Sequence, residues 1–303
     1  MKLASVALQS GQVLGAVVSG EGYAVLPDGL GVADLIAAGL DRALEIGGRA
    51  GGIRPWGTDD ARLALPYRPT SVRDFVTFES HVEGVRKSID NAVDVPEAWY
   101  DGPTFYFTNP HALYGPGEAI RRPRTCRRLD FELEVGAIVS GGGADLSDEA
   151  AHAAIFGYTI VNDWSARDIQ SREMQVGLGP AKGKDFATSI GPWIVTADEV
   201  ADRHDARGRL DLTATVSVNG VEVGRDTLAH MNWSFAHMVA YASRDSVVLT
   251  GDLLASGTTG GGGCLAELWG RRGTDDPAPL EPGDVVTMRV EGLGELTGLV
   301  ATA

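Results

Sequence analysis

Residues 128–138 read RLDFELEVGAI and carry an acidic side chain at every second position from Asp130 to Glu134. Because successive side chains of a β-strand point to opposite faces, Asp130, Glu132 and Glu134 would share one face, and the apolar residues between them the other. If both faces are covered, the carboxylates need water, cations of the chain or a metal ion, since an unpaired buried carboxylate is costly. An amphipathic strand with one solvated face explains this stretch alone equally well.

Strand-like segments dominate the chain beyond residue 70. They are short apolar or alternating runs bounded by glycine and polar residues, and they span residues 157–162, 192–195, 210–218, 221–224, 247–249, 285–290 and 295–300. The dipeptide Asn219-Gly220 is typical of a tight hairpin turn. Because helices interrupt these segments without a regular strand–helix alternation, we predict an α+β, mostly β fold with antiparallel strands rather than a doubly wound sheet.

Helices are predicted at three places in this part of the chain. Over residues 78–93 apolar side chains recur at helical spacing, and His81 lies at the margin of the apolar face. Ser147 is a typical N-cap residue, and acidic residues follow it in the first turn of the expected helix. A third helix is expected over residues 228–242.

The first 70 residues read as a smaller unit. Short strands are expected at 4–8 and 14–18, and one helix over 32–46, which Gly47 and Gly48 end. The stretch LALPYRPTSVRD, residues 63–74, contains two prolines and is typical of a connection. We therefore predict a small N-terminal α/β domain, residues 1–70, and a larger catalytic domain, residues 71–303.

Composition excludes some classes of function. The chain has 26 basic against 41 acidic residues, a formal charge of −15 that argues against nucleic-acid binding. No apolar run approaches the length that spans a bilayer, so we expect no membrane association. Cys126 and Cys264 have no metal-type spacing, and unpaired thiols suit a reducing compartment, which favours a soluble cytoplasmic protein.

Three further segments concentrate polar groups. In GYTIVNDWSARDIQ, residues 157–170, Asp163 follows an apolar strand, where it can belong to a site or merely cap a helical turn. Lys184 lies among glycines in LGPAKGKDFATSIGPW, residues 178–193, and is either a surface lysine or a cation aimed into an acidic pocket. Glu267 follows a glycine-rich run in SGTTGGGGCLAELW, residues 256–269, which favours a loop close to a ligand.

Taken together, these segments resemble the fumarylacetoacetate hydrolase family. The similarity covers most of the chain from about residue 73 and is carried, in order, by RDFVTFESH, LDFELEVG, NDWSARDIQ, GPAKGKDFATSIGPW, SGTTG, LAEL and EPGDVV. The resemblance implies a mixed β-roll catalytic domain behind a smaller N-terminal domain, assembled as a homodimer. It also implies a divalent metal, most often Mg²⁺, with Ca²⁺ or Mn²⁺ as substitutes.

The resemblance also implies a metal site. The family's metal carboxylates fall on Glu132, Glu134 and Asp163, and Asp74 matches a fourth acidic ligand of the fumarylacetoacetase branch. The alternating carboxylates would then converge on one hard cation, which prefers oxygen ligands. Asp130 shares their face, but the motif does not make it a ligand, and we expect a structural role for it.

A histidine and a glutamate of the same branch fall on His81 and Glu267. An imidazole can take a proton from water while the carboxylate holds its tautomer. Another branch uses a glutamate three residues after the histidine, but that position is Gly84 and Glu83 comes one residue early. We therefore predict that His81 pairs with Glu267.

Further positions match residues of the family that contact substrate. Arg167, Gln170 and Lys184 correspond to groups that bind substrate oxygens or stabilise developing charge, and Thr258 to a substrate-contacting threonine. Val76 and Met174 stand where the fumarylacetoacetase branch places tyrosines. These two changes remove groups that would hold a long dicarboxylate.

The predicted activity is therefore metal-assisted hydrolysis of a carbon–carbon bond in a small β-diketo acid, either acylpyruvate or a fumarylacetoacetate-like compound. Water would be activated by His81 with Glu267. Decarboxylation, isomerisation or hydration of a 2-oxo acid on the same metal site is the first alternative, because a fold does not choose among these reactions. A non-catalytic protein that binds small oxo acids is the second.

Overall fold

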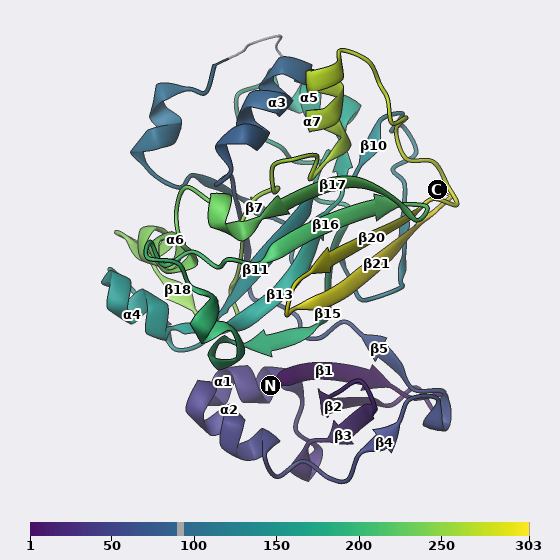
Figure 1. Cartoon of the computed structure of the whole chain (residues 1–303), viewed down its shortest axis with the longest axis vertical. Helices are drawn as coiled ribbons and strands as arrows, with labels where there is room; N and C mark the ends of the chain where they lie inside the picture. Colours follow the sequence, from purple (N-terminus) through teal and green to yellow (C-terminus); the bar gives the residue numbers. More distant parts are fainter. Residues whose placement is uncertain (90–93, 303) are drawn as a thin grey trace.

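The computed structural model describes residues 1–89 and 94–302 of the chain. Figure 1 shows a smaller lobe, built from the first strands and helices, beneath a larger lobe that holds the remaining elements. Strands outnumber helices, and the structure is mixed α+β and mostly β, as the sequence predicts. No helix of the described residues is long and apolar enough to cross a membrane.

The smaller lobe contains a curved run of strands and two helices, whose bounds are β1 (Lys2–Ala7), β2 (Val13–Val18), β3 (Gly22–Val25), β4 (Arg54–Pro55), β5 (Arg62–Ala64), α1 (Val32–Ala38) and α2 (Leu40–Gly47). The prediction of one helix over 32–46 is wrong. Gly39 separates α1 from α2 with φ 87° and ψ 161°, a conformation that essentially only glycine adopts. The apolar spacing continues across this break, so periodicity alone could not reveal it.

The larger lobe is built mainly from strands, and its short 3₁₀ helices, like those of the smaller lobe, lie in connections. The remaining strands are β6 (Val72–Phe75), β7 (Phe105–Thr108), β8 (Leu113–Tyr114), β9 (Ala119–Arg121), β10 (Leu129–Asp130), β11 (Leu133–Val139), β12 (Gly142–Gly143), β13 (Ile155–Asp163), β14 (Ser165–Ala166), β15 (Thr188–Thr196), β16 (Thr213–Val218), β17 (Val221–Thr227), β18 (Val248–Leu249), β19 (Leu253–Ala255), β20 (Val285–Val290) and β21 (Gly294–Ala301). The 3₁₀ helices are η1 (Pro27–Gly29), η2 (Thr58–Asp60), η3 (Glu97–Asp101), η4 (Ala197–Arg203) and η5 (Leu228–His230).

One sheet runs through both lobes, in the order β4-β3-β2-β1-β15-β13-β11-β19-β6-β7. The lobes join where β1 pairs antiparallel with β15, with Lys2 opposite Val195. A second sheet, in the order β17-β16-β20-β21-β9, lies against the larger part of the first (Figure 1). The two lobes thus share a sheet, and the division into domains at residue 70 stays a prediction.

Both faces of the first sheet are covered. The largest apolar core lies between the two sheets and includes Val135 and Ala137 of β11. On the opposite face, Ile138 of the same strand packs in a core that also holds Leu35 and Ile36 of α1. Near the start of β11, Glu132 and Glu134 are buried as well, which makes the solvated-face alternative wrong.

The stretch 128–138 is not one continuous strand. It forms β10 and β11, and residues 131 and 132 interrupt them. At this break the backbone N–H of Glu132 donates to Asn162 Oδ1 at 3.1 Å instead of a strand carbonyl. The interruption is local, since β11 pairs with β13 from Leu133 opposite Asn162 onward.

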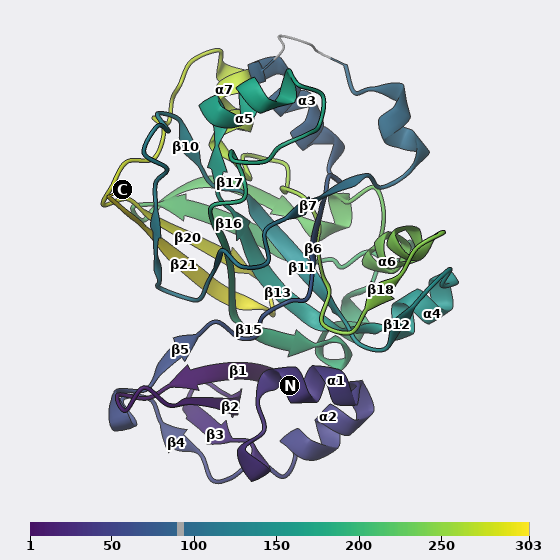
Figure 2. The same cartoon turned by 180° about the vertical axis from the view of Figure 1, so that it is seen from behind.

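Helices α3 (Glu79–Ile89), α5 (Arg167–Met174) and α7 (Leu265–Arg272) gather at the end of the larger lobe that faces away from the smaller one, as both views show (Figure 2). Residues 90–93 of the predicted helix 78–93 lie outside the described residues. Helix α4 (Asp148–Ala153) begins after Ser147, whose side chain caps it as predicted. The predicted helix 228–242 is wrong in its first part: η5 precedes α6 (Phe235–Ser243), which Ser234 caps.

Replacing Gly39 by alanine should lower the free energy of unfolding by about 1–3 kcal/mol, the cost of forcing a side chain into this conformation. An added Cβ would meet nothing closer than Ser140 Oγ at 4.0 Å, so crowding would contribute little. Equilibrium unfolding in urea measures the change. Gly20→Ala is the matched control, since that position has open space and no positive φ; equal stabilities of the two variants would contradict the argument.

Candidate active site

Four acidic side chains from separate segments meet at the helical end of the larger lobe. Asp74 lies on β6, Glu132 in the break between β10 and β11, Glu134 on β11, and Asp163 at the end of β13. In the first sheet β13, β11, β19 and β6 are consecutive neighbours, which brings these positions to one region. All four side chains are buried.

Three of these carboxylates form a group that could hold a metal ion. Asp74, Glu132 and Glu134 each offer one oxygen, and these atoms lie within 4.8 Å of one another. Neither oxygen of Glu134 has a hydrogen-bond partner within residues 1–89 and 94–302, although both are buried. Buried oxygens without donors are suitable ligands for a hard divalent cation, so the chemistry of this group fits the expected metal.

Burial and the closeness of the carboxylates to one another raise the pKa values of two of them. Burial, followed by the charge of Asp163, raises the pKa of Asp74 well above its usual value. Burial and then Asp74 do the same to the pKa of Glu134. Without a cation, these two carboxyl groups therefore retain protons at pH values where exposed acids have lost them.

Two buried cations lie against the same acids. Lys184 Nζ donates to Glu132 Oε2 and to Asp163 Oδ2, both at 2.6 Å. Arg167 Nη2 lies 2.7 Å from Glu132 Oε1. Burial disfavours the charged form of Glu132, but Lys184 and then Arg167 outweigh it and lower the pKa of Glu132. This carboxylate therefore stays ionised without a metal.

Arg167 also contacts two residues besides Glu132. Its Nε donates to Asp130 Oδ2 at 2.8 Å and its Nη1 to Gln170 Oε1 at 3.0 Å. Asp130 in turn accepts from the first backbone N–H groups of α7, at Leu265 and Ala266. The structural role expected for Asp130 is thus visible: it ties the start of α7 to Arg167.

Asp163 is adjacent to the group of three rather than part of it. The Tyr106 hydroxyl lies 2.5 Å from Asp163 Oδ2 and 2.9 Å from Asp74 Oδ2, and joins the two acids. Sequence analysis missed Tyr106. It faces the site because β6 and β7 pair with Asp74 opposite Tyr106, a register that no motif of the sequence indicates.

His81 and Glu267 approach each other across α3 and α7. His81 Nδ1 lies 3.6 Å from Glu267 Oε2, longer than a hydrogen bond but in the range that catalytic pairs show before substrate binds. Glu267 Oε1 is held by Arg271 at 2.6 Å and by the backbone N–H of Gly262. Its other oxygen, Oε2, has no hydrogen-bond partner among the described residues and is left to face the imidazole.

Gly84 permits this approach of the two helices. A Cβ at this position would lie 2.5 Å from Glu267 Cγ, closer than real side-chain contacts. A glutamate could therefore not occupy position 84 without displacing the side chain of Glu267. Gly84 and Glu267 therefore belong together, because a glycine three residues after His81 leaves the space that the Glu267 side chain occupies.

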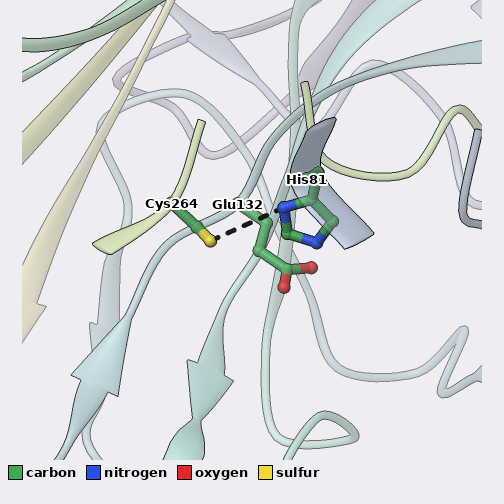
Figure 3. A group of neighbouring side chains, drawn as sticks. All are labelled: His81, Glu132 and Cys264. Carbon is green, nitrogen blue, oxygen red and sulfur yellow. Dashed lines mark hydrogen bonds between the residues drawn. The ribbon is translucent and has the colours of Figure 1, made fainter. Parts of the chain in front are cut away.

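Cys264 is a further neighbour of the histidine. Its Sγ lies 3.8 Å from His81 Nδ1, on the side of the imidazole drawn with the dashed line (Figure 3). The thiol is fully buried, and it accepts from the backbone N–H of Glu267 at the start of α7. Sequence analysis assigned it no role.

A pocket of about 300 Å³ opens onto these groups. Its polar end contains the acidic residues Asp74, Glu132 and Glu134, with His81, Lys184, Arg167 and Gln170. The predicted substrate-contacting residues Val76, Met174 and Thr258 also line it. Apolar side chains form much of the remainder: Phe75, Val76, Val85, Phe105, Met174 and Pro180.

Comparison with known proteins identifies relatives of this arrangement. Residues 70–301 match the family described as fumarylacetoacetate hydrolase, C-terminal. Fumarylacetoacetase from Bos taurus is 31% identical over 256 residues, which cover 68% of this chain and 60% of that protein. The chain therefore spans less than two thirds of the length of this relative.

Two solved structures are similar over the whole chain. Fumarylacetoacetate hydrolase from Exiguobacterium antarcticum is 24% identical with a TM-score of 0.75, covering 100% of both chains. A 2-hydroxyhepta-2,4-diene-1,7-dioate isomerase from Mycobacterium marinum is 25% identical with a TM-score of 0.68, covering 100% of this chain and 98% of that one. The fold is thus shared by proteins described as hydrolases and as isomerases.

Glu134→Gln should abolish most of the stabilisation that Mg²⁺ gives the protein. The amide cannot become the carboxylate that the cation needs, so binding of Mg²⁺ is weakened; without metal the change replaces a protonated carboxyl group by a neutral amide of the same shape, so the metal-free variant should unfold at the same temperature as wild type or a higher one. Thermal unfolding with and without Mg²⁺ measures both effects. The exposed Glu21→Gln is the control and should keep the full shift with Mg²⁺; an unchanged shift in Glu134→Gln would remove this residue from the metal site.

Binding of Mg²⁺ should release protons and tighten as pH rises. The pKa values of Asp74 and Glu134 are raised, so a cation that needs ionised ligands must displace their protons. Raising the pH removes those protons beforehand, and the apparent affinity increases. Titration calorimetry in two buffers of different ionisation enthalpy counts the protons; heat that does not depend on the buffer, with pH-independent affinity, would refute the proposed ligands.

Proposed function

This chain belongs to the fumarylacetoacetate hydrolase family, and from this premise we propose that it hydrolyses a carbon–carbon bond in a small β-diketo acid of the acylpyruvate type. One observation carries the proposal: an imidazole facing a buried glutamate lies in the same pocket as three carboxylates suited to a divalent cation. Hydrolysis needs both parts, a base for water and a means of holding the substrate's oxygens.

The metal site in this proposal consists of Asp74, Glu132 and Glu134, with Asp163 beside them. Mg²⁺ is the expected ion and Ca²⁺ or Mn²⁺ are substitutes, because all prefer oxygen ligands. When bound, the ion supplies Lewis-acid polarisation of the oxo and carboxylate oxygens of the substrate. Lys184 keeps Glu132 and Asp163 in place beside it.

His81 acts as the base in the first step. It takes a proton from water, and the resulting hydroxide adds to the carbonyl carbon that bears the acyl substituent. Glu267 fixes the tautomer in which Nδ1 carries its proton, leaving Nε2 to accept the one from water. The anchoring of Glu267 by Arg271 and Gly262 supports this role, because the carboxylate that orients the base is itself held.

Cleavage of the carbon–carbon bond follows. The tetrahedral oxyanion collapses to a carboxylic acid, and the electron pair of the bond passes to the methylene carbon as the enolate of the 2-oxo acid. The proton held by His81 completes the balance by reaching that carbon. Lys184 donates two of its three protons to carboxylates, and the third remains for the oxyanion.

Gln170 and Arg167 have distinct parts in this scheme. Arg167 occupies the oxygen of Gln170, which leaves the amide NH₂ as the group that faces a substrate oxygen. We assign Arg167 a positioning role, because its nitrogens already serve Asp130, Glu132 and Gln170. Thr258 contributes a hydroxyl to the pocket wall.

The lining of the pocket favours an uncharged acyl group. Of the described residues that line it, only Arg167 and Lys184 carry a full positive charge, and both are committed to carboxylates. Val76, Val85 and Met174 offer apolar surface instead. A second carboxylate on the substrate would lose its hydration there without a paired cation.

The alternative reactions use the same groups differently. Decarboxylation, isomerisation or hydration of a 2-oxo acid needs the cation and Lys184, and one relative in fold is described as an isomerase. The His81–Glu267 pair provides a base for water, which hydrolysis and hydration need and which decarboxylation and isomerisation do not. In a non-catalytic oxo-acid-binding protein, the His81–Glu267 pair would have no function.

Two further expectations belong to this proposal. Cys126 and Cys264 are unpaired, which suits a reducing compartment such as the cytoplasm. A homodimer remains an expectation from the family.

His81→Gln should lower kcat on an acylpyruvate with a neutral acyl group by about 10²–10⁴-fold, the usual contribution of a general base. Binding of Mg²⁺ should be kept, because His81 is not among the three carboxylates. The Mg²⁺-loaded enzyme is assayed with product identification, against a dicarboxylate analogue and oxaloacetate. The neutral substrate should have the larger kcat/KM, and the products should be pyruvate and a carboxylic acid.

The control for this experiment is His152→Gln, which alters an exposed histidine of α4. Its kcat should equal that of wild type. Full activity of His81→Gln would remove the proposed base. Release of CO₂ from oxaloacetate as the dominant reaction would replace hydrolysis by decarboxylation.

A further inference from the structure

Cys264 is a buried nucleophilic side chain that the proposed reaction leaves unused. It caps the start of α7, and its Sγ lies 3.8 Å from His81 Nδ1 (Figure 3). A ring nitrogen of His81, a carboxylate oxygen of Glu132 and the sulfur of Cys264 all lie within 4.8 Å of one another. Three different donor elements thus meet at one place.

This donor set differs in chemistry from the group of three carboxylates. Nitrogen and thiolate ligands suit Zn²⁺ and other borderline-soft cations, whereas Mg²⁺ selects oxygen. In a tetrahedral Zn²⁺ site, bond lengths of about 2.3 Å to sulfur and 2.0–2.1 Å to nitrogen place these two atoms about 3.6 Å apart. The observed separation of 3.8 Å is already close to this value.

We propose that His81, Glu132 and Cys264 form a second metal site, which takes Zn²⁺ or a similar cation and thereby withdraws His81 from catalysis. The ion would bind a thiolate, so one proton leaves Sγ for solvent on binding. His81 and Glu132 line the pocket and give the ion its path, while Cys264 lies behind them. That the ion inhibits rests on the proposed function; that it binds does not.

A second observation points to a cation at this place. Glu267 Oε2 is buried, has no hydrogen-bond partner among the described residues, and lies 3.6 Å from the same Nδ1. Arg271 already pairs with the other oxygen of this carboxylate, and a cation near Nδ1 would give Oε2 the partner that it lacks. Lys184 and Arg167 already contact the oxygens of Glu132, but each carboxylate oxygen keeps a further lone pair for a metal.

Cd²⁺ is the probe for this site, because its bond to a thiolate gives an ultraviolet charge-transfer absorption at longer wavelength than that of Zn²⁺. Titration is done on the full chain in excess Mg²⁺, which occupies the carboxylate group. The absorption should saturate at a single equivalent of Cd²⁺ in wild type and disappear in Cys264→Ser. Serine is a favourable N-cap residue, so this variant keeps the cap of α7.

Cys126→Ser is the matched control, since Cys126 is the other buried thiol and lies beside Asp168. It should keep the full absorption. His81→Gln serves as a second variant that does not alter the sulfur, and it should weaken Cd²⁺ binding by at least about tenfold. Absence of the absorption in wild type, its persistence in Cys264→Ser or an unchanged affinity in His81→Gln would each overturn the site.

Measuring turnover with and without Zn²⁺ tests the inhibitory role of the site separately. Zn²⁺ should inhibit turnover of wild type and Cys126→Ser to the same degree, and the ratio of rates with and without Zn²⁺ should approach one in Cys264→Ser. Equal inhibition of all three proteins would overturn the inhibitory role. If no substrate is turned over at all, the proposed function fails, and the Cd²⁺ absorption still decides whether the second site exists.

Discussion

The structure depends on the enclosure of four carboxylates by protein. Asp74, Glu132, Glu134 and Asp163 are all buried, yet among residues 1–89 and 94–302 only Lys184 and Arg167 contact them as cations, and Arg167 also neutralises Asp130. In their ionised forms, these acids would therefore place an excess of negative charge among buried groups. Such an excess is tolerated when protons or a bound cation compensate it. The raised pKa values of Asp74 and Glu134 and the unpartnered oxygens of Glu134 are two expressions of this one constraint.

The same crowding of buried acids affects the carboxylates in two different ways. Lys184 and Arg167 lower the pKa of Glu132 and hold it ionised, whereas Asp74 and Glu134 respond to whatever cation is present. On the other side of the pocket, close packing of α3 on α7 brings His81 to a glutamate that is anchored through its other oxygen. The packing of α3 on α7 thus positions the base, and the pairing of the strands positions the carboxylates. Glu132 and His81 are the points at which the two arrangements meet.

Short local patterns in the sequence predicted some features of the fold and the site. The alternating acids of residues 130–134 indicated carboxylates that share one face but left open whether that face is buried or solvated, and Ser147 correctly predicted the start of α4. Features set by tertiary packing were missed. Tyr106 reaches the acids because β6 and β7 pair in one particular register, and Cys264 lies near His81 at the start of α7, which Asp130 holds through the backbone. The break at Gly39 was missed because the apolar periodicity continues through it. Neither the register between two distant strands nor the backbone conformation of a single glycine leaves a periodic pattern in the sequence.

The central claim is that the excess of buried negative charge marks the place of one divalent ion. Anomalous diffraction from crystals containing Mn²⁺ locates such an ion directly, without reference to any substrate. The account predicts a single strong peak within about 2.0–2.6 Å of carboxylate oxygens of Asp74, Glu132 and Glu134. A site that stays empty at saturating Mn²⁺, with Lys184 or ordered water against the oxygens of Glu134, would contradict it.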